Sequence, residues 1–440
     1  MPNRPKTFWI ASTLAAVALA EILFFLQYPG PIYDAYGYYV LSQRIVKGGL
    51  FAVAFPSRTY AYPLFVAFCS GFREAAPATV RVVVFHVQLG LLLAAAAFAA
   101  RLLGDLFRSD AARRSTYAAV ALNPFLLARA TETLSDLLAA VLSFTAVLLA
   151  LKRDFPARTQ SPPAAAVGSL FLAALAAAVR PAAISVLAVV FGLWIVRQAL
   201  WRELRLAILP LLLLVAALPF LPQAAVNRKA YGRAEPLVVE HLYREQVEMG
   251  IARLKYATDV SPGASPQIDY VNPLYRGEGT RAFALRRPFA YLATCALHLF
   301  AVLDQDSLFT YSRDRHPPYR WPLQAVQFLF VLTGALGAVL ALAGQSPLAR
   351  DPRRFATLSF LAAAAASLAI YVPTAVESRF ATAFELFWTP FAVTGALAVR
   401  EWWRQRKWKI LAVLGAGALL WLAVCLKLSA WIIAQVPKLR

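Results

Sequence analysis

Apolar runs long enough to cross a membrane recur from one end of this chain to the other. Of its 440 residues, 60% are hydrophobic and only 15% are charged, far more apolar than a soluble globular protein. Because a helix needs about 20 mainly apolar residues to cross the bilayer core, the sequence predicts an all-α polytopic membrane protein with about 11 transmembrane helices (11–13). The expected spans are 8–26, 80–103, 116–128, 134–151, 164–179, 182–196, 206–226, 321–343, 355–372, 380–399 and 410–434.

Polar stretches between these spans divide the chain into three expected segments. Residues 1–226 hold seven spans and a first outer loop, residues 28–79. Residues 227–320 form an outer cap, and residues 321–440 hold four spans. Residues 288–303 are apolar enough to cross the membrane, but one more span there would invert the orientation of every later loop. We therefore expect this stretch to be a juxtamembrane helix that lies along the outer surface or re-enters the membrane from it.

The distribution of Lys and Arg between the connections predicts the orientation. With the amino terminus in the cytoplasm, one set of short connections carries twenty cations, and the opposite short turns carry one each. The loops 28–79 and 227–320 then face outward. This bias and contact with anionic membrane lipids explain the net charge of +21, so nucleic acid is not an expected partner. The twenty cations are Arg4, Lys6, Arg101, Arg108, Arg113, Arg114, Lys152, Arg153, Arg158, Arg197, Arg202, Arg205, Arg350, Arg353, Arg354, Arg400, Arg404, Arg406, Lys407 and Lys409.

The first outer loop combines one early acid with many aromatic residues and several cations. Asp34 stands among four tyrosines, and Arg58 precedes a second aromatic patch that includes Tyr60. This composition favours a binding site at the membrane surface for a charged amphipathic ligand. Asp34 has a second possible role, because Asp is a favoured N-cap and a helix is expected over residues 35–46.

Two further groups of charged residues lie in short outer turns. Glu132 and Asp136 are four residues apart, so we expect both on one helix face at the outer end of the fourth span, with Arg129 close enough to neutralise them. These residues form either a structural ion pair or a functional site. Arg180 precedes a proline, and Arg379 follows Glu377; each arginine could extend to the membrane surface or offer its guanidinium to a phosphate.

The sequence makes no certain cofactor prediction. Asp304 and Asp306 form a DxD triplet in the outer cap that could bind a divalent metal together with a phosphate. The four histidines show no metal-ligand spacing, and the chain contains no P-loop, GxGxxG, GxSxG or HExxH motif.

Six stretches in order resemble the GT-C superfamily of polytopic glycosyltransferases. Its bacterial members near the lipid A aminoarabinose transferase and the protein O-mannosyltransferases look most similar. The stretches are YDAYGYYVLSQRIVKGG from Tyr33, RTYAYPLF from Arg58, NPFLLARATETLSDLL from Asn123, VRP at Arg180, NRKAYG from Asn227 and ESRFATAFELFWTPF from Glu377.

The resemblance implies a GT-C-like fold and a sugar donor carried on a polyprenyl phosphate. It implies an acid of the first outer loop as catalytic base, which corresponds to Asp34, and a second catalytic acid that corresponds to Glu132. Basic residues of the outer loops hold the lipid phosphate in this family, which suggests Arg58, Arg180 and Arg379. The expected location is a bacterial inner membrane, with the active site on the periplasmic side and a lipid, glycan or protein as acceptor. We expect no large carboxy-terminal soluble domain of the kind that some relatives have, which leaves the acceptor open.

Three alternative functions stay open. A lipid or polyisoprenoid flippase or other transporter would place ionisable groups near the membrane midplane, whereas here only Glu385 and Lys427 lie well inside a span. A ligase of the O-antigen type would need a cavity for an oligosaccharide. A membrane scaffold without catalytic activity is the third alternative.

Overall fold

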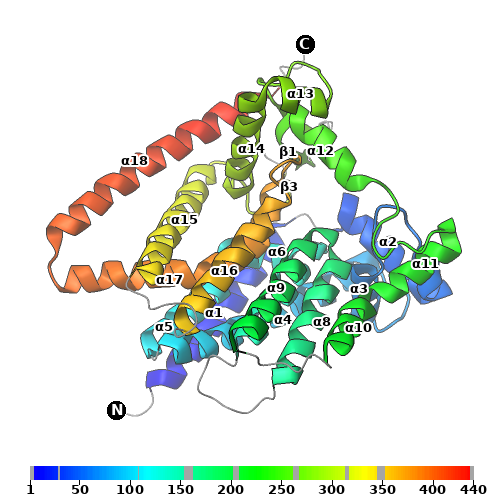
Figure 1. Cartoon of the computed structure of the whole chain (residues 1–440), viewed down its shortest axis with the longest axis horizontal. Coiled ribbons are helices and arrows are strands. Elements are labelled where there is room, and N and C mark those ends of the chain that lie inside the picture. Colours follow the sequence, from blue (N-terminus) through cyan, green and yellow to red (C-terminus); the bar gives the residue numbers. More distant parts are fainter. Residues whose placement is uncertain are drawn as a thin grey trace. The chain divides into compact units, whose positions relative to one another are not determined.

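The structure is a computed structural model that describes residues 4–27, 30–107, 109–152, 162–201, 208–260, 267–312, 317–343 and 352–436 (Figure 1). These residues are mostly helical, as the sequence predicts. Among them, seven helices are long and apolar enough to cross a membrane, or eight if one bent pair counts as a single span. The chain is therefore a multi-pass membrane protein. The total of about 11 spans stays a prediction, because it also counts shorter helices.

The long apolar helices coincide with predicted spans. Other apolar segments that were predicted to span form shorter helices, among them residues 164–179. The helices in this group are α1 (Arg4–Leu26), α4 (Pro77–Phe107), α8 (Pro162–Val179), α9 (Ile184–Trp201), α10 (Leu209–Ala217), α11 (Leu221–Tyr231), α15 (Arg320–Leu342), α16 (Pro352–Ala369), α17 (Thr382–Arg404) and α18 (Trp408–Ile433). Single 3-10 turns η3 (Pro181–Ala183), η5 (Leu218–Phe220) and η7 (Ser378–Ala381) precede α9, α11 and α17.

The predicted third span, residues 116–128, is wrong as a continuous helix. It is divided between α5 (Asp110–Ala121) and α6 (Pro124–Ala130). The Asn123 side chain accepts hydrogen bonds from the backbone N–H groups of residues 125 and 126, and Pro124 occupies the first helical position, so α6 starts anew there. A second break follows, because α6 and α7 (Ser135–Leu151) meet at 118°. The turn that carries Glu132 is therefore held between two helix ends.

The chain forms two compact units. The first comprises Met1–Glu240, Ala341–Ser367 and Thr382–Pro390. In it, the loop predicted to lie outside contains α2 (Tyr33–Gly48), η1 (Leu50–Val53) and α3 (Ala61–Cys69). Apolar residues of α2 and α3, such as Leu41 and Val66, are buried in one cluster with Val84 of α4. Because each fully buried apolar side chain contributes about 1.5–3 kcal/mol, this loop has its own well-packed position.

The second unit comprises His241–Leu340, Leu368–Ala381 and Phe391–Arg440. It contains a three-stranded sheet that the all-α prediction missed. The strands are β1 (Arg253–Asp259), β2 (Gln267–Val271) and β3 (Tyr311–Ser312), in the order β2-β1-β3. β1 pairs antiparallel with β2 and parallel with β3. The other elements of the cap are α12 (Leu242–Ala252), α13 (Thr280–Arg286) and α14 (Pro288–Leu303), which is the helix expected near residues 288–303.

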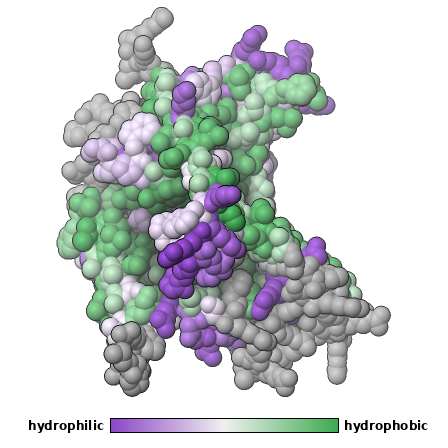
Figure 2. Space-filling model, turned by 90° about the vertical axis from the view of Figure 1, so that its left-hand side faces the viewer, coloured by the Kyte–Doolittle hydropathy of each residue, from purple (hydrophilic) through white to green (hydrophobic). Residues whose placement is uncertain are grey.

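Two features of the second unit tie its cap to its long helices. The N–H of Val271 donates to the carbonyl of Gln435, so the sheet lies beside the carboxyl end of α18. α15 and α17 approach closely, because a Cβ on Gly337 would collide with the backbone of Phe391 and one on Gly395 with the backbone of Thr333. Much of the surface is apolar in the view of Figure 2, as expected for a protein in lipid.

Candidate functional site

Asp34 and Arg58 form an ion pair in the first unit. The guanidinium Nη2 of Arg58 lies 2.5 Å from Oδ1 of Asp34, and its central carbon lies 4.5 Å from the ring centre of Tyr38. The side chains of Arg58 and Asp34 are 20% and 38% exposed, so both remain accessible from solvent. A carboxylate and a guanidinium that meet at an accessible surface can together receive a hydroxyl and a phosphate.

The expectation that Asp34 caps a helix is wrong. α2 begins at Tyr33, its N-cap is Ile32, and no side chain caps it. Asp34 lies in the first helical turn, where the helix dipole stabilises a negative charge. Tyr33 has a φ of 47°, in the left-handed region that a bulky residue adopts only at a cost of roughly 1–3 kcal/mol. The turn before Asp34 therefore holds backbone strain beside the ion pair.

The charge on Arg58 is stabilised by its neighbours. Burial disfavours this charge, but Tyr38 and Asp34 outweigh the burial, and the pKa of Arg58 is raised above its ordinary value. Arg58 therefore stays cationic at every physiological pH.

Arg180 and Asp136 form a second ion pair of the same kind. Nη1 of Arg180 lies 2.8 Å from Oδ1 of Asp136. Arg180 is placed by the end of α8 and by Pro181, which starts η3. Asp136 is buried in the first turn of α7. Arg180 therefore has a specific partner within the protein, which simple extension to the membrane surface does not require.

Two contacts join these ion pairs into one site. The hydroxyl of Tyr38 lies 3.3 Å from that of Ser135, next to Asp136. Oγ1 of Thr59 donates to the carbonyl of Val179 at 3.5 Å, next to Arg180. The two segments that carry Arg58 and Arg180 are thus in contact, and binding of a phosphate by these arginines stays a prediction.

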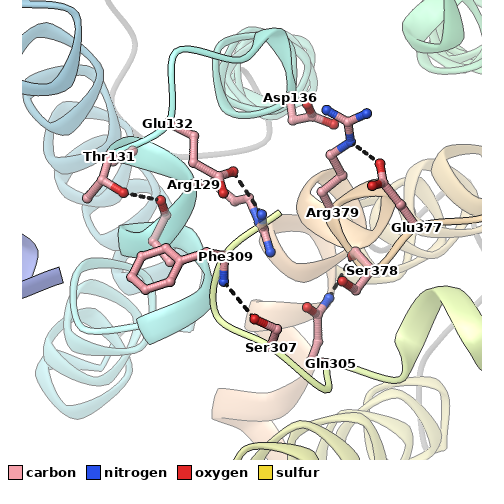
Figure 3. A network of polar contacts seen from close by, with 12 residues as sticks. Arg129, Thr131, Glu132, Asp136, Gln305, Ser307, Phe309, Glu377, Ser378 and Arg379 are labelled. Carbon is pink, nitrogen blue, oxygen red and sulfur yellow. Dashed lines mark hydrogen bonds and ion pairs between the residues drawn. The ribbon is translucent and has the colours of Figure 1, made fainter. Parts of the chain in front are cut away.

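Glu132 and Arg129 form a third ion pair, which is deeply buried. Oε2 of Glu132 lies 2.8 Å from Nη1 of Arg129, and both side chains are 2% exposed (Figure 3). The prediction that Glu132 and Asp136 share one helix face is wrong, because α7 begins only at Ser135. The bend between α6 and α7 gives the two acids different arginine partners.

Gln88 of α4 fixes the turn that carries Glu132, and sequence reasoning missed it. Its side-chain nitrogen donates to the carbonyls of Ala130 and Glu132 at 3.1 and 2.8 Å. Its side-chain oxygen accepts from the hydroxyl of Tyr62 at 3.4 Å. Burial is the main cause that raises the pKa of Tyr62 well above its usual value, and nearby groups that can carry negative charge add to it. The Tyr62 hydroxyl therefore keeps its proton and donates it in the hydrogen bond to Gln88. A polar side chain inside an apolar span is the sequence signal that marks Gln88.

Glu385 also belongs to the first unit and lies beside the same turn. Its Oε2 accepts a hydrogen bond from Nδ2 of Asn123 at 3.2 Å, and Arg129 is close enough to interact with it electrostatically. The residue was noted in the sequence as a charge inside a span, but its partner Asn123 was not predicted. The Asn-Pro pair at the start of α6 was the signal available for Asn123.

Tyr60, another candidate, is a structural anchor. Its hydroxyl donates to the carbonyl of Pro219 at 2.9 Å, and its N–H donates to Oε1 of Gln223 at 2.7 Å. Gln223 donates in turn to Asn227, the first residue of the NRKAYG element. These buried contacts hold the backbone two residues after Arg58.

The remaining candidates lie in the second unit. Arg379 pairs with Glu377 at 2.5 Å, and the side chain of Gln305 donates to the carbonyl of Ser378 at 2.8 Å (Figure 3). The predicted DxD triplet and the predicted arginine are therefore neighbours. Between them opens a small cavity of about 40 Å³ that is also lined by residues of all three strands.

Lys255, which sequence reasoning missed, neutralises the DxD triplet. Its Nζ lies 2.8 Å from Oδ1 of Asp306 and 3.9 Å from Oδ2 of Asp304. Asp304 also accepts from Gln324 and Ser429 at 2.6 and 2.8 Å. Burial raises the pKa of Asp304, while Lys255 acts in the opposite direction.

These contacts favour a structural ion cluster over the predicted divalent-metal site. The Lys255 ammonium supplies the positive charge that a metal would bring. Within the described parts of the chain, no three His, Cys, Asp or Glu side chains gather to hold a metal ion.

No protein-family model matches the chain, and no curated protein matches its sequence significantly. Its function is therefore inferred from its own residues and their geometry.

Proposed function

We propose that this chain is a membrane glycosyltransferase of the GT-C type, a hexosyl- or pentosyltransferase. It transfers a sugar from a polyprenyl-phosphate donor to a hydroxyl of a lipid, glycan or protein acceptor. In this proposal the site faces the periplasm of a bacterial inner membrane and the amino terminus lies in the cytoplasm. No nucleotide-binding motif is present in the sequence, which fits a donor that is carried by the membrane.

The proposal rests on two ion pairs, Asp34–Arg58 and Asp136–Arg180, which lie on segments that contact each other. Both arginines sit at partly exposed positions, and each already holds an anionic oxygen at 2.5–2.8 Å. A lipid phosphate offers the same type of oxygen and can take over guanidinium donors. Two arginines on separate segments therefore suit one phosphate group.

Phosphate binding would also prepare the base. In the free protein the Asp34 carboxylate is ion-paired with Arg58, which makes it a weaker base. When the donor phosphate binds the guanidinium, this ion pair weakens and Asp34 can accept a proton. The base would thus become available only when the donor is present, which limits wasteful reactions with water.

The proposed reaction is a direct displacement. The acceptor oxygen attacks the anomeric carbon and passes its proton to Asp34 as the bond from that carbon to the phosphate oxygen breaks. The polyprenyl phosphate leaves with the bonding electrons, and Arg58 and Arg180 stabilise its charge. The product has the inverted anomeric configuration. A general base contributes about 10²–10⁴-fold to such a step.

The other candidates have supporting roles in this proposal. Glu132 and Arg129 hold the bend before α7 and so position Asp136. Arg379, which pairs with Glu377 in the second unit, stays a separate prediction as a phosphate-binding residue.

The experiment compares Asp34→Asn with Asp110→Asn in the purified full-length chain. Asp110 is an exposed acid at the start of α5 and serves as the matched control. The donors are radiolabelled polyprenyl-phosphate mannose, glucose and aminoarabinose, with a membrane extract as acceptor. We expect Asp34→Asn to lose 10²–10⁴-fold in turnover and Asp110→Asn to keep it. Full turnover by Asp34→Asn would exclude Asp34 as the base.

A further inference from the structure

A wide groove in the second unit lies between α12 and α13, apart from every residue used above. Its volume is about 1180 Å³. Tyr243, Val247 and Ile251 line it from α12, and residues 279–282 and 284–286 line it from the start and length of α13.

The groove carries an excess of positive charge. It is lined by three arginines, Arg244, Arg281 and Arg286, and by one carboxylate, Glu248, which pairs with Arg244 at 3.0 Å. Arg281 and Arg286 are exposed, and among the described residues neither has a carboxylate within ion-pair distance. Nearby Arg287, in contrast, pairs with Glu278 at 3.5 Å. Two cations therefore remain to receive an anion from outside.

A polar atom in the same groove also lacks a partner. Oγ1 of Thr280 is buried and makes no hydrogen bond to any described residue. It lies at the start of α13, next to Arg281. A hydroxyl beside two unpaired guanidinium groups can bind a phosphate oxygen.

Large apolar side chains are exposed beside these cations. Leu285 of α13 is 71% exposed, and Phe289 and Leu292 of α14 are 86% and 62% exposed. Three such side chains are suited to contact with acyl chains and not with water. Cations next to exposed apolar side chains are the arrangement that binds the surface of an anionic bilayer.

We propose that this groove binds the headgroup of an anionic membrane lipid. Arg281, Arg286 and Thr280 hold the headgroup phosphate, while Leu285, Phe289 and Leu292 enter the layer of acyl chains. The exposed apolar side chains favour a lipid over an acidic glycan, which offers them no partner. The site shares no residue with the proposed donor site, so its failure and the failure of the transferase proposal are separate results.

The test measures lipid retention by native mass spectrometry on the full-length protein in detergent. The probes are phosphatidylglycerol and phosphatidylcholine with the same acyl chains. Arg281→Gln/Arg286→Gln is compared with Arg233→Gln/Arg276→Gln, which removes the same charge from exposed positions outside the groove. We expect the groove variant to bind phosphatidylglycerol about thirtyfold more weakly, the effect of two surface cations, and phosphatidylcholine as before. The control should retain both lipids.

A second arm separates the lipid from its free headgroup. Leu285→Ser/Phe289→Ser should weaken retention of phosphatidylglycerol but not binding of glycerophosphoglycerol, which has no acyl chains. Unchanged phosphatidylglycerol binding by the arginine variant, or equal losses in its control, would overturn the proposal. Loss of binding to dextran sulfate alone would also overturn it, because it would identify an acidic glycan as the ligand.

Discussion

The hydroxyl of Tyr38 lies 3.3 Å from the hydroxyl of Ser135, and this contact joins the loop after α1 to the first turn of α7. The ring of the same tyrosine lies under the guanidinium of Arg58. One side chain thus connects the Asp34–Arg58 pair to the segment that carries Asp136. The position of the base relative to the second arginine depends on it.

Tyr38→Phe should loosen the site without unfolding it. The variant keeps the ring under Arg58 but loses the hydroxyl, with its contact to Ser135 and its hydrogen bond to Arg58, each worth about 1 kcal/mol. We expect binding of polyprenyl phosphate, measured by titration, to weaken by at least about fivefold. Tyr36→Phe, on the exposed side of α2, is the control and should bind as the wild type does. Equal affinity of both variants would mean that Tyr38 does not position the site.

Arg58→Gln and Arg180→Gln should each weaken binding of polyprenyl phosphate. A hydrogen bond to a charged group contributes about 1.5–3 kcal/mol, so the loss should be roughly tenfold or more for each arginine. Arg44→Gln changes an exposed arginine of the same loop and is the matched control. Wild-type affinity in both arginine variants would reject the phosphate site.

Glu132→Gln should destabilise the fold strongly. It leaves Arg129 buried without its main counter-charge, and breaking a buried ion pair costs about 3–5 kcal/mol. The measurement is the thermal unfolding midpoint in detergent. Glu248→Gln breaks the exposed pair with Arg244 and should change stability by less than about 1 kcal/mol. Similar midpoints for the two variants would show that the buried pair contributes no more than a surface pair.

Lys255→Met should lower stability in a pH-dependent way. Without this cation, the pKa of Asp304 rises further in the folded state, while its unfolded value stays near 3.8. The folded state then binds the proton more tightly than the unfolded chain does. The contribution of Asp304 to the free energy of unfolding is therefore fully present below its unfolded pKa. It is lost as the pH rises through its folded pKa.

The difference in unfolding midpoint between wild type and Lys255→Met should therefore widen as the pH rises above the unfolded pKa of Asp304. Lys47→Met, which breaks the exposed pair with Glu74, should give a small difference at every pH. A difference for Lys255→Met that narrows with rising pH would contradict the assigned ion cluster.

Gly337→Ala should destabilise the contact between α15 and α17. The added methyl group would meet the backbone of Phe391, which cannot move aside as a flexible side chain would. Overpacking of this kind costs about 1–3 kcal/mol. Gly415→Ala on α18 has open space around its Cβ and should leave the unfolding midpoint unchanged or raise it. A neutral Gly337→Ala would mean that the two helices are free to separate.

The long spans could be predicted because hydropathy is a local property of the sequence. The α1, α4, α15 and α18 helices are continuous apolar runs that need no knowledge of their neighbours. The broken third span was missed because hydropathy passes smoothly through Asn123, although the Asn-Pro pair carried a helix-start signal. The sheet was missed because β3 has two residues and pairs with a strand about fifty positions earlier.

The charged residues of the site could be named from the sequence, but their partners could not. Asp34 and Arg58 are separated by two helical segments and an irregular turn, so only the folded loop brings them together. The sequence predicts Asp136 near Arg129, but the bend before α7 places Asp136 in an ion pair with Arg180. Gln88 and Lys255 were overlooked because neither belongs to a motif and the role of each depends on its neighbours in space.

The bend between α6 and α7 has a consequence for changes in chain length. Each residue of an α-helix advances the chain by about 100° around the axis, because a turn holds 3.6 residues. Because α7 starts directly after this bend, one residue inserted into α7 just after Asp136 would rotate the rest of the helix by that angle relative to Asp136. The helix could then not keep both its buried face and the Asp136–Arg180 pair.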